Sequence, residues 1–221
     1  MSDSVIIIGA SGHGKVVLDC IEKCGKSKVI GFLDRNYQPN NAFCGYPILG
    51  TEFDLCRIRQ DVLSLRVVIA IGNNYVREML YFKLVSMMPD LVFETVIHPS
   101  ADLARGVHIG AGTVVMPGAV INSDSKIGIG CIVNTNASVD HDNRVNDFAS
   151  LAPNSATGGN VTLGRGSSIC IGASISHQVS IGDYSVVGAG SVVLSDVDSQ
   201  KVVVGIPARC IRSRTQSEPY L

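Results

Sequence analysis

The feature that most constrains this chain is an aliphatic residue at every sixth position of its C-terminal half. Of the seventeen positions reached in steps of six from Ile97 to Val193, sixteen hold Ile, Leu or Val, and the other, Thr157, is β-branched. A period of six fits neither an α-helix nor a simple array of hairpins. It is typical of a parallel β-helix, a prism in which three six-residue faces make one coil of about 18 residues.

A second column, two positions before the aliphatic one, runs from Val107 to Ser191 and is almost entirely small. We expect the aliphatic side chains to point into the prism and the small residues to let the chain turn each corner, where Gly and Asn tolerate positive φ. Neighbouring coils should lie about 4.8 Å apart, so that each inward residue stacks on the equivalent residue of the next coil. Regularity alone proves no chemistry, because such a prism could serve only as a rigid scaffold for trimers.

The composition suits a core of flat, stacked sheets, because aromatic residues make up only 5% of the chain and Gly is abundant. A net charge of −1 leaves no basic surface for nucleic acid or for an anionic membrane. The chain has no signal-peptide pattern, and no stretch reaches the roughly 18 apolar residues of a membrane span. The seven cysteines have neither CxxC nor zinc-site spacing, which predicts reduced thiols, a cytoplasmic location and no bound metal.

The first part of the chain, residues 1–96, alternates strand-like and helix-like segments and predicts an α/β domain with a Rossmann-like parallel sheet. We expect strands at 5–8, 29–33, 67–71 and 91–96, helices at 15–24, 52–60 and 75–87, and a loop at 35–50 that contains Pro39 and Pro47. Pro99 marks the change into a prism domain at 97–198, and residues 199–221 form a C-terminal segment.

Residues 9–14, between the first strand and the first helix, have the sequence GASGHG. The backbone N–H groups of such a turn and the positive end of the following helix suit a phosphate, and Asp34 stands where an acid could bind a ribose. The spacing is not that of the dinucleotide motif, and the sheet lacks the strands of a full dinucleotide fold, so the turn favours a nucleotide sugar over NAD. A tight strand–helix connection without a ligand is the alternative. An NAD(P)-dependent oxidoreductase is excluded, because the rest of the chain is prism and offers no site for hydride transfer.

His141 lies two residues after the inward-pointing Val139, and therefore at an outer corner of the prism. A step of one coil brings Gly159 beside it, and a second step brings His177. Because Gly158 precedes Gly159, the backbone beside His141 is bare. It leaves room for a thin pantetheine chain and exposes an N–H to a thioester oxygen.

Residue type makes His141 a candidate general base. Acetylation of an amine or a hydroxyl needs a base that takes the proton of the nucleophile, and the pKa of His lies near neutrality. A neighbouring carboxylate can fix the ring tautomer and stabilise the imidazolium, and either Asp142 or Asp140 could supply it.

Together these residues resemble the bacterial sugar acyltransferases, a family that groups sialic acid O-acetyltransferases with nucleotide-sugar N-acetyltransferases. The resemblance runs from end to end and rests on IIGASGHGKVV at 7–17, GFLD at 31–34, AIGNN at 70–74 with Arg77, IHPSA at 97–101, VDHD at 139–142, LAP at 151–153 and VGIPAR at 204–209. It implies a homotrimer of left-handed parallel β-helices with active sites between adjacent subunits. Left-handed coils depart from the usual right-handed crossover, which short flat strands make possible.

The resemblance also implies roles for individual residues. His141 would be the general base and Asp142 its partner. The substrate, a UDP-linked amino sugar, would be bound through Gly9, Ser11, Gly12, His13, Asp34, Arg35, Gly72 and Asn73. Acetyl-CoA would lie along the prism and contact Gly159, Gly205, Pro207 and Ala208.

One position departs from the family pattern. Many relatives carry a second His nine residues after the base, and here that residue is Ser150. Any role of the second His in holding the acetyl group would then be weaker, or taken by a hydroxyl or a water molecule. His177 stands where relatives often have Pro, and we interpret it as a surface variant.

The form of the SGHG turn and the pair Leu33-Asp34 most resemble the branch of this family whose members are acetyl-CoA-dependent N-acetyltransferases. That resemblance implies action on the 4-amino group of a UDP-linked 4-amino-4,6-dideoxy sugar. An O-acetyltransferase acting on a sialic-acid-like sugar uses the same scaffold and stays open. A non-catalytic, nucleotide-binding trimeric scaffold also stays open, because Ser150 replaces the second His of the family.

Overall fold

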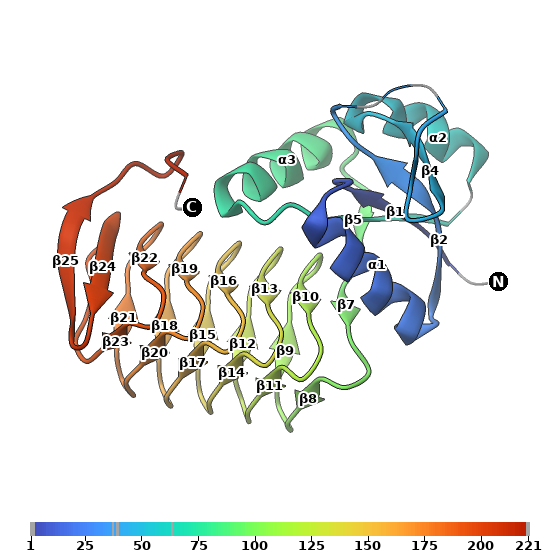
Figure 1. The fold of residues 1–221 in the computed structure, drawn as a ribbon. Coiled ribbons are helices and arrows are strands. Elements are labelled where there is room, and N and C mark those ends of the chain that lie inside the picture. The colour runs from blue at the N-terminus through green and yellow to red at the C-terminus, as the bar shows by residue number, and fades with distance from the viewer. Residues whose placement is uncertain (1–2, 37, 39, 63, 220–221) are drawn as a thin grey trace.

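The computed structural model of this chain describes residues 3–36, 38, 40–62 and 64–219. These residues form an N-terminal α/β part seated on a three-sided prism (Figure 1). The N-terminal sheet has the strand order β3-β4-β2-β1-β5-β6, with β1 (Asp3–Ile8), β2 (Ser27–Leu33), β3 (Ala42–Phe43), β4 (Tyr46–Gly50), β5 (Leu65–Ile69) and β6 (Val92–Phe93). The helices are α1 (Gly12–Cys24), the 3₁₀ turn η1 (Glu52–Asp54), α2 (Leu55–Asp61) and α3 (Asn74–Met87).

The central strand β1 shows why this segment forms a covered parallel sheet. Its last four residues are all buried, and they form the continuous apolar run typical of a parallel strand with both faces covered. Val17 of α1 packs in the cluster that contains Ile7, whereas Leu84 of α3 packs in the cluster that contains Ile6. The predicted Rossmann-like arrangement is therefore confirmed.

Helix α1 begins at Gly12, three residues before the predicted start at 15. Ser11 has an extended backbone (φ −137°), and its carbonyl accepts the N–H of Lys15 at 3.1 Å, so the helical hydrogen bonding starts inside the glycine-rich turn. As a result His13 belongs to the first turn of the helix and not to the loop before it.

The prediction of a loop at 35–50 is wrong for its second half, which contains β3 and β4. Strand β4 pairs with β2, and the aromatic rings of Phe43 and Tyr46 meet the ring of Phe32 with centroids 5.1 and 6.4 Å away. Burial of these apolar side chains outweighs the turn-forming Pro, Gly and Asn residues. Pro47 lies in β4 opposite Ala42 of the short edge strand, whereas Pro39 lies outside the described residues.

The predicted strand at 91–96 is two strands that belong to different sheets. Strand β6 completes the N-terminal sheet, and β7 (Val96–Ile97) is the first strand of the prism. The strand is interrupted at Glu94, whose carboxylate accepts hydrogen bonds from Ser27 Oγ and Arg66 Nη1, both at 3.0 Å. These contacts tie the end of β6 to the N-terminal sheet before the chain enters the prism.

Seventeen two-residue strands, β7 to β23, build the prism, and each pairs with the strand one coil away. The first face contains β7, β10 (Val114–Val115), β13 (Ile132–Val133), β16 (Ser150–Leu151), β19 (Ser168–Ile169) and β22 (Val186–Val187), followed by β24 (Lys201–Gly205) and β25 (Ala208–Ser213). The second face contains β8 (Asp102–Leu103), β11 (Val120–Ile121), β14 (Ser138–Val139), β17 (Ala156–Thr157), β20 (Ser174–Ile175) and β23 (Val192–Val193). The third face contains β9 (His108–Ile109), β12 (Lys126–Ile127), β15 (Arg144–Val145), β18 (Thr162–Leu163) and β21 (Ser180–Ile181).

The predicted register of the prism is confirmed. Val115 pairs with Val133, and Val133 pairs with Leu151, so residues 18 apart stack in parallel. The aliphatic column forms one continuous core cluster along the coils, and Thr157 of that column is buried at 5% exposure. This is the parallel β-helix that the hexad repeat predicts, and it is left-handed, as the family resemblance implies.

The corners are turned one residue earlier than predicted. The small residues point inward, as the fully buried Ala137 and Ala149 show, whereas the left-handed conformation falls on the residue before each of them. That column consists of Gly106, Gly112, Gly118, Asp124, Gly130, Asn136, Asp142, Phe148, Asn154, Asn160, Gly166, Gly172, Gln178, Tyr184 and Gly190. Phe148 (φ 58°) and Tyr184 (φ 54°) are costly in this conformation. Both pack against α3, where the Phe148 ring meets Tyr81 and the Tyr184 hydroxyl donates to Glu78.

The N-terminal part lies over the first face of the prism. Helix α1 covers its beginning, where Cys20 and Met116 share a buried cluster, and α3 extends over the coils that follow (Figure 1). At the opposite end, β24 and β25 form an antiparallel hairpin that continues the first face. In the part of the chain that the structure describes, no helix combines the length and the apolarity that crossing a membrane would take.

Candidate active site

The candidate base and its carboxylates lie at the corner between the second and third faces, in the turn from β14 to β15. His141 Nδ1 and Asp142 Oδ2 are 2.8 Å apart, and both side chains are 54% exposed. Asp142 occupies the left-handed corner position (φ 57°). Of the two carboxylates that the sequence offers, the one that contacts the ring is therefore Asp142.

Asp140 makes a different contact. Its Oδ1 accepts the backbone N–H of His141 at 2.8 Å and the Asn122 side-chain amide at 3.1 Å. The hydrogen bond from the His141 N–H is the main reason why the pKa of Asp140 is lowered, so this carboxyl stays ionised near neutral pH. Asp140 thus fixes the backbone of the turn and adds a negative charge beside the ring.

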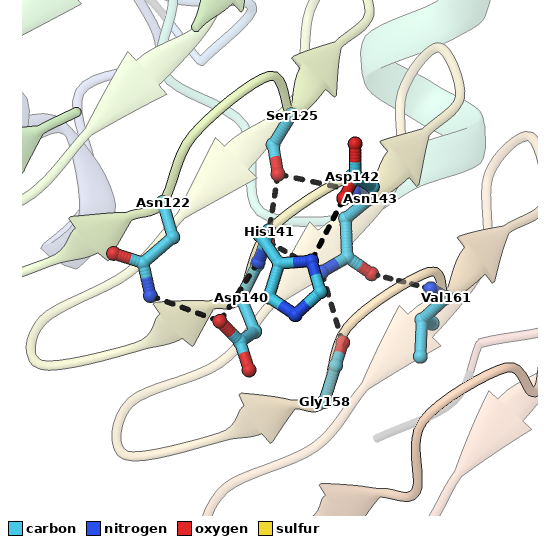
Figure 2. Close-up of polar contacts among 8 residues, drawn as sticks. All are labelled: Asn122, Ser125, Asp140, His141, Asp142, Asn143, Gly158 and Val161. Atoms are coloured by element: carbon cyan, nitrogen blue, oxygen red, sulfur yellow. Dashed lines mark hydrogen bonds and ion pairs between the residues drawn. The ribbon is translucent and has the colours of Figure 1, made fainter. Parts of the chain in front are cut away.

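Two buried residues hold the turn rigid (Figure 2). The Ser125 hydroxyl donates to the carbonyl of Asp140 at 2.6 Å, and the Asn143 amide donates to the same carbonyl at 2.6 Å and to that of Gly158 at 2.9 Å. Asn143 also accepts the N–H of Val161 at 2.9 Å. Sequence reasoning missed both residues, although Asn143 is the one asparagine in the small column and could have been noticed there.

Electrostatics favour a ring that is ready to accept a proton at Nε2. The hydrogen bond with Asp142, followed by the negative charge of Asp140, raises the pKa of His141. A neutral ring donates its Nδ1–H to Asp142 and keeps the lone pair on Nε2. The pair therefore has the orientation that a general base needs.

The ring lies directly against bare backbone of the next coil. A Cβ placed on Gly159 would come within 2.6 Å of both Cε1 and Nε2 of His141. The backbone connects the same column further on, because the N–H of Asn160 donates to the His141 carbonyl and that of Gln178 to the Gly159 carbonyl. The predicted column of His141, Gly159 and His177 is thus present in the structure.

A second candidate site is a cavity of about 240 Å³ at the carboxyl ends of β1 and β5, the edge where ligands bind in open α/β sheets. Five predicted substrate-binding residues line it, namely Gly9, Ser11, Asp34, Arg35 and Gly72. The lining also includes Asn36, Glu52 and Val76, which the sequence did not single out.

Both carboxylate oxygens of Asp34 already accept backbone N–H groups, one from Ala10 at 2.8 Å and the other from Asn36 at 2.9 Å. Asp34 therefore fixes the glycine-rich turn at the edge of the cavity. Each oxygen keeps a second lone pair that a hydroxyl of a ligand could use.

Three predicted substrate-binding residues, Gly12, His13 and Asn73, do not line this cavity. His13 Nε2 is buried, and among the described residues it has no hydrogen-bond partner. Burial, helped by the positive charge of Arg77, lowers the pKa of His13 to about 4. A neutral His13 brings no positive charge to a phosphate. Asn73 is the N-cap of α3, where its Oδ1 accepts the N–H of Val76 at 3.1 Å.

The predicted cofactor residues of the C-terminal segment lie in the β24–β25 hairpin, at the far end of the prism from the N-terminal part (Figure 1). Gly205 pairs with Ala208 across the hairpin, and the Ile206–Pro207 peptide bond is cis. Ala208 also lines an open cavity together with Lys201 and Arg209.

Known proteins resemble both parts of this structure. The family model described as the PglD N-terminal domain matches residues 4–84. A crystal structure of a perosamine N-acetyltransferase from Caulobacter crescentus is 37% identical, and the match covers 95% of this chain and 97% of that one with a TM-score of 0.89. The chain belongs to the hexapeptide-repeat nucleotide-sugar N-acetyltransferases. This family comprises acetyl-CoA-dependent sugar N-acetyltransferases with a left-handed β-helix, and membership in it confirms the predicted resemblance.

Other members of this N-acetyltransferase family resemble the chain to different extents. The acetyltransferase domain of PglB from Neisseria gonorrhoeae FA1090, solved in complex with acetyl coenzyme A, is 32% identical over 96% of this chain and 100% of that one, with a TM-score of 0.89. The UDP-N-acetylbacillosamine N-acetyltransferase of Bacillus subtilis (strain 168) is 38% identical over 115 residues, so the match spans about half of this chain and half of that curated relative. The C. crescentus structure is of a variant with Asn in place of a His, in complex with CoA and GDP-perosamine.

Within this N-acetyltransferase fold, Ser150 does not lie on the corner of His141. It is in β16 on the first face, buried beneath α3, and its Oγ accepts the side-chain amide of Asn74 at 3.0 Å. The same amide donates to the Ser168 hydroxyl and to the carbonyls of Gly166 and Ser167. Ser150 thus helps to fix α3 to the prism.

Arg77 completes this anchor, although its side chain is almost fully buried. Its Nε donates to the carbonyl of Gly130 at 2.6 Å and its Nη2 to that of Phe148 at 2.9 Å, both in the prism. Its Nη1 donates to the carbonyl of Ile71 at 2.8 Å and to that of Gly72, which lines the N-terminal cavity. One guanidinium therefore joins the prism to the loop of the candidate nucleotide site.

Among the described residues there is no group of three or more His, Cys, Asp or Glu side chains that could hold a metal ion. The solved structures of two relatives contain CoA or acetyl coenzyme A. The prediction that acetyl-CoA is the acyl donor is confirmed by these structures.

Proposed function

We propose that this chain transfers the acetyl group of acetyl-CoA to the 4-amino group of a nucleotide-linked 4-amino-4,6-dideoxy sugar, with His141 as general base and Asp142 as its partner. The observation that carries the proposal is the 2.8 Å contact between His141 Nδ1 and Asp142 Oδ2 at an exposed corner, with Nε2 beside the bare backbone of Gly159. Two relatives are named as N-acetyltransferases, one of perosamine and one of a bacillosamine sugar. These names support an amine as the acceptor.

The chemistry follows from this orientation. The amine nitrogen attacks the thioester carbonyl, and His141 Nε2 takes a proton from the nitrogen as the N–C bond forms. Asp142 stabilises the resulting imidazolium through Nδ1–H. The C–S bond then breaks, the sulfur leaves as CoA thiolate, and a proton returns to it. The bare backbone at Gly158 and Gly159 leaves the space in which the thioester would lie.

For the nucleotide we propose UDP, because the SGHG turn and Leu33-Asp34 most resemble that branch of the family. The relatives include both choices, since the B. subtilis enzyme is named for a UDP sugar and the C. crescentus structures contain GDP-perosamine. A cytoplasmic location would suit the seven cysteines, all of which are free thiols in the structure.

A thiol-release assay tests the function. Acetyl-CoA is supplied with UDP-, GDP- and dTDP-linked 4-amino sugars, their 4-hydroxy counterparts and free sialic acids. Release of CoA with the UDP-linked 4-amino sugar is the expected result. Turnover of sialic acids or 4-hydroxy sugars alone would establish O-acetylation instead. Binding of nucleotide without turnover of any acceptor would favour the scaffold.

A second prediction concerns pH. Because the pKa of His141 lies above its ordinary value of 6.5, the base is protonated and inactive until the pH rises past that raised pKa. Asp142→Asn removes the main cause of the increase. The acid limb of the kcat/KM profile should then move to lower pH, while the plateau falls by about 10- to 100-fold because the ring loses its orientation. An acid limb that does not move would contradict the pairing.

We further propose a homotrimer whose active sites lie between subunits. The candidate nucleotide cavity belongs to the part that covers the first face, whereas His141 lies on the opposite corner, between the second and third faces. A sugar held in the cavity would have to pass through its own prism to reach the His141 of the same chain. In a closed three-fold assembly, the sugar would instead reach the His141 corner of a neighbouring subunit.

Mixed trimers test this arrangement. His141→Ala lacks the base, and Gly72→Leu fills the nucleotide cavity at a glycine with no atom within 4 Å of its would-be Cβ. Each variant alone should be inactive. Trimers formed by coexpressing the two should recover about one quarter of native activity, the fraction of sites that combine an intact corner with an intact neighbouring cavity. Mixed trimers that stay inactive would place each site within one chain.

A further inference from the structure

One group at the His141 corner has no part in the proton transfer described above, namely the second carboxylate oxygen of Asp140. Oδ1 is held by the His141 N–H and by Asn122, whereas for Oδ2 the structure shows no hydrogen bond with any described residue. Figure 2 shows this side chain beside the His141 ring, on the side away from Asp142. The free oxygen therefore faces the space into which Nε2 of the base also points.

The position of this carboxylate is fixed in advance of binding. Asp140 is only partly exposed, and its backbone carbonyl accepts from the buried Ser125 and Asn143. Its low pKa keeps it charged. A rigid, ionised carboxylate with one unused oxygen suits a cationic ligand group, because hydrogen bonds between charged partners are stronger than those between neutral ones.

We propose that Asp140 is the residue that selects an amine over a hydroxyl at the acceptor position, by binding the ammonium form of the sugar's amino group through Oδ2. This inference rests on the proposed function. An alkylammonium group is the solution form of such a sugar at neutral pH, and it would donate one N–H to Asp140 while a second faces His141 Nε2. The nitrogen first gives one proton to Nε2, which passes it to water. The lone pair freed on the nitrogen then attacks the thioester, and Nε2 takes the second proton as the N–C bond forms. A hydroxyl would make only a neutral donor's hydrogen bond to the same oxygen.

The experiment compares two ligands that differ at one atom. Calorimetry measures the binding of a nucleotide-linked 4-amino-4,6-dideoxyhexose and of its 4-hydroxy counterpart to the CoA-loaded full chain, with the nucleotide that the wild type turns over. The native chain should prefer the amine by about tenfold or more, the difference between a charge-assisted and a neutral hydrogen bond. Asp140→Asn keeps the shape and an oxygen for Asn122 and the His141 N–H. It should reduce the preference to within about twofold, leave binding of the hydroxy sugar unchanged, and raise the KM of the amino sugar but not that of acetyl-CoA.

Asp183→Asn is the matched control. Asp183 lies at another corner of the prism, and its Oδ1 also accepts a backbone N–H at 2.8 Å, in this case from Arg165 one coil away. The Asp183→Asn substitution also removes one negative charge, and this variant should keep the full preference for the amine. If Asp140→Asn also keeps the preference, or weakens the binding of both ligands equally, the proposal that Asp140 selects the amine is wrong. If the wild type neither binds nor acetylates any 4-amino sugar, the proposed function itself fails, so the two failures are distinct.

Discussion

Replacing His141 by alanine is expected to lower kcat by at least about 100-fold and towards the 10,000-fold limit of general-base catalysis. The substitution removes the only imidazole of the 140–143 turn, and Asp142 and Asp140 on either side cannot take its place, because a carboxylate is a far weaker base than an imidazole. The side chain is 54% exposed and packs in no core, so the fold should not change. The measurement is the rate of CoA release with the best acceptor of the panel.

Two controls separate the loss of a base from the loss of structure. The His141→Ala chain should bind acetyl-CoA with native affinity and should have the native oligomeric mass. His177→Ala removes an exposed histidine two coils away in the same column. Its turnover should stay within about threefold of the native value, because His177 is neither the base nor its partner. Near-native turnover of His141→Ala would show that another group takes the proton and would remove the basis of the proposed mechanism.

Replacing Arg77 by methionine is expected to destabilise the chain by about 4 kcal/mol. Methionine fills similar space but donates no hydrogen bond. It leaves the carbonyls of Gly130, Phe148 and Ile71 without the donor that now satisfies them. Each buried acceptor left unpaired costs about 1–3 kcal/mol. Lysine should not restore stability, because one ammonium cannot reproduce the fork of the guanidinium.

Urea unfolding measures the effect on the free energy of unfolding. The matched control is Arg57→Met, because the Arg57 side chain is 66% exposed and only 3.6 Å from Asp54 in a surface ion pair, which contributes little. At low urea, Arg77→Met should also raise the KM of the nucleotide sugar more than that of acetyl-CoA, since Arg77 holds the loop of Gly72. A native unfolding midpoint for Arg77→Met would contradict its role as the anchor between the two parts.

The periodic features of the chain could be predicted, because in a regular repeat the residues that stack on one another are a fixed number of positions apart. Once residue 97 is inward, the pairing of Val133 with Leu151 and the placement of His141 above Gly159 follow by counting. The choice between Asp140 and Asp142 could not be made in this way. It depends on the left-handed backbone at Asp142, which lies at the corner, whereas the column of small residues predicts the corner one residue later, at Asn143.

Contacts between distant parts of the chain were beyond prediction for a different reason. Asn74 meets Ser150 across 76 residues, and nothing in the local pattern of either segment indicates the other. The split of the strand at 91–96 is similar, because it depends on Glu94 reaching Ser27 and Arg66. The neutral state of His13 also depends on burial that only the packed molecule creates.

The uninterrupted coil has a consequence for how chains of this kind can change length. An insertion of 18 residues between Ile97 and His141 would lengthen the prism by one coil, about 4.8 Å, and return the His141–Asp142 pair to the same corner. An insertion of six would keep every aliphatic residue inside but would rotate that pair by a third of a revolution, out of line with the anchored nucleotide cavity. One or two extra residues within a face would turn polar side chains inward. Length variation that preserves the reaction is therefore restricted to whole coils or to loops that bulge from a corner.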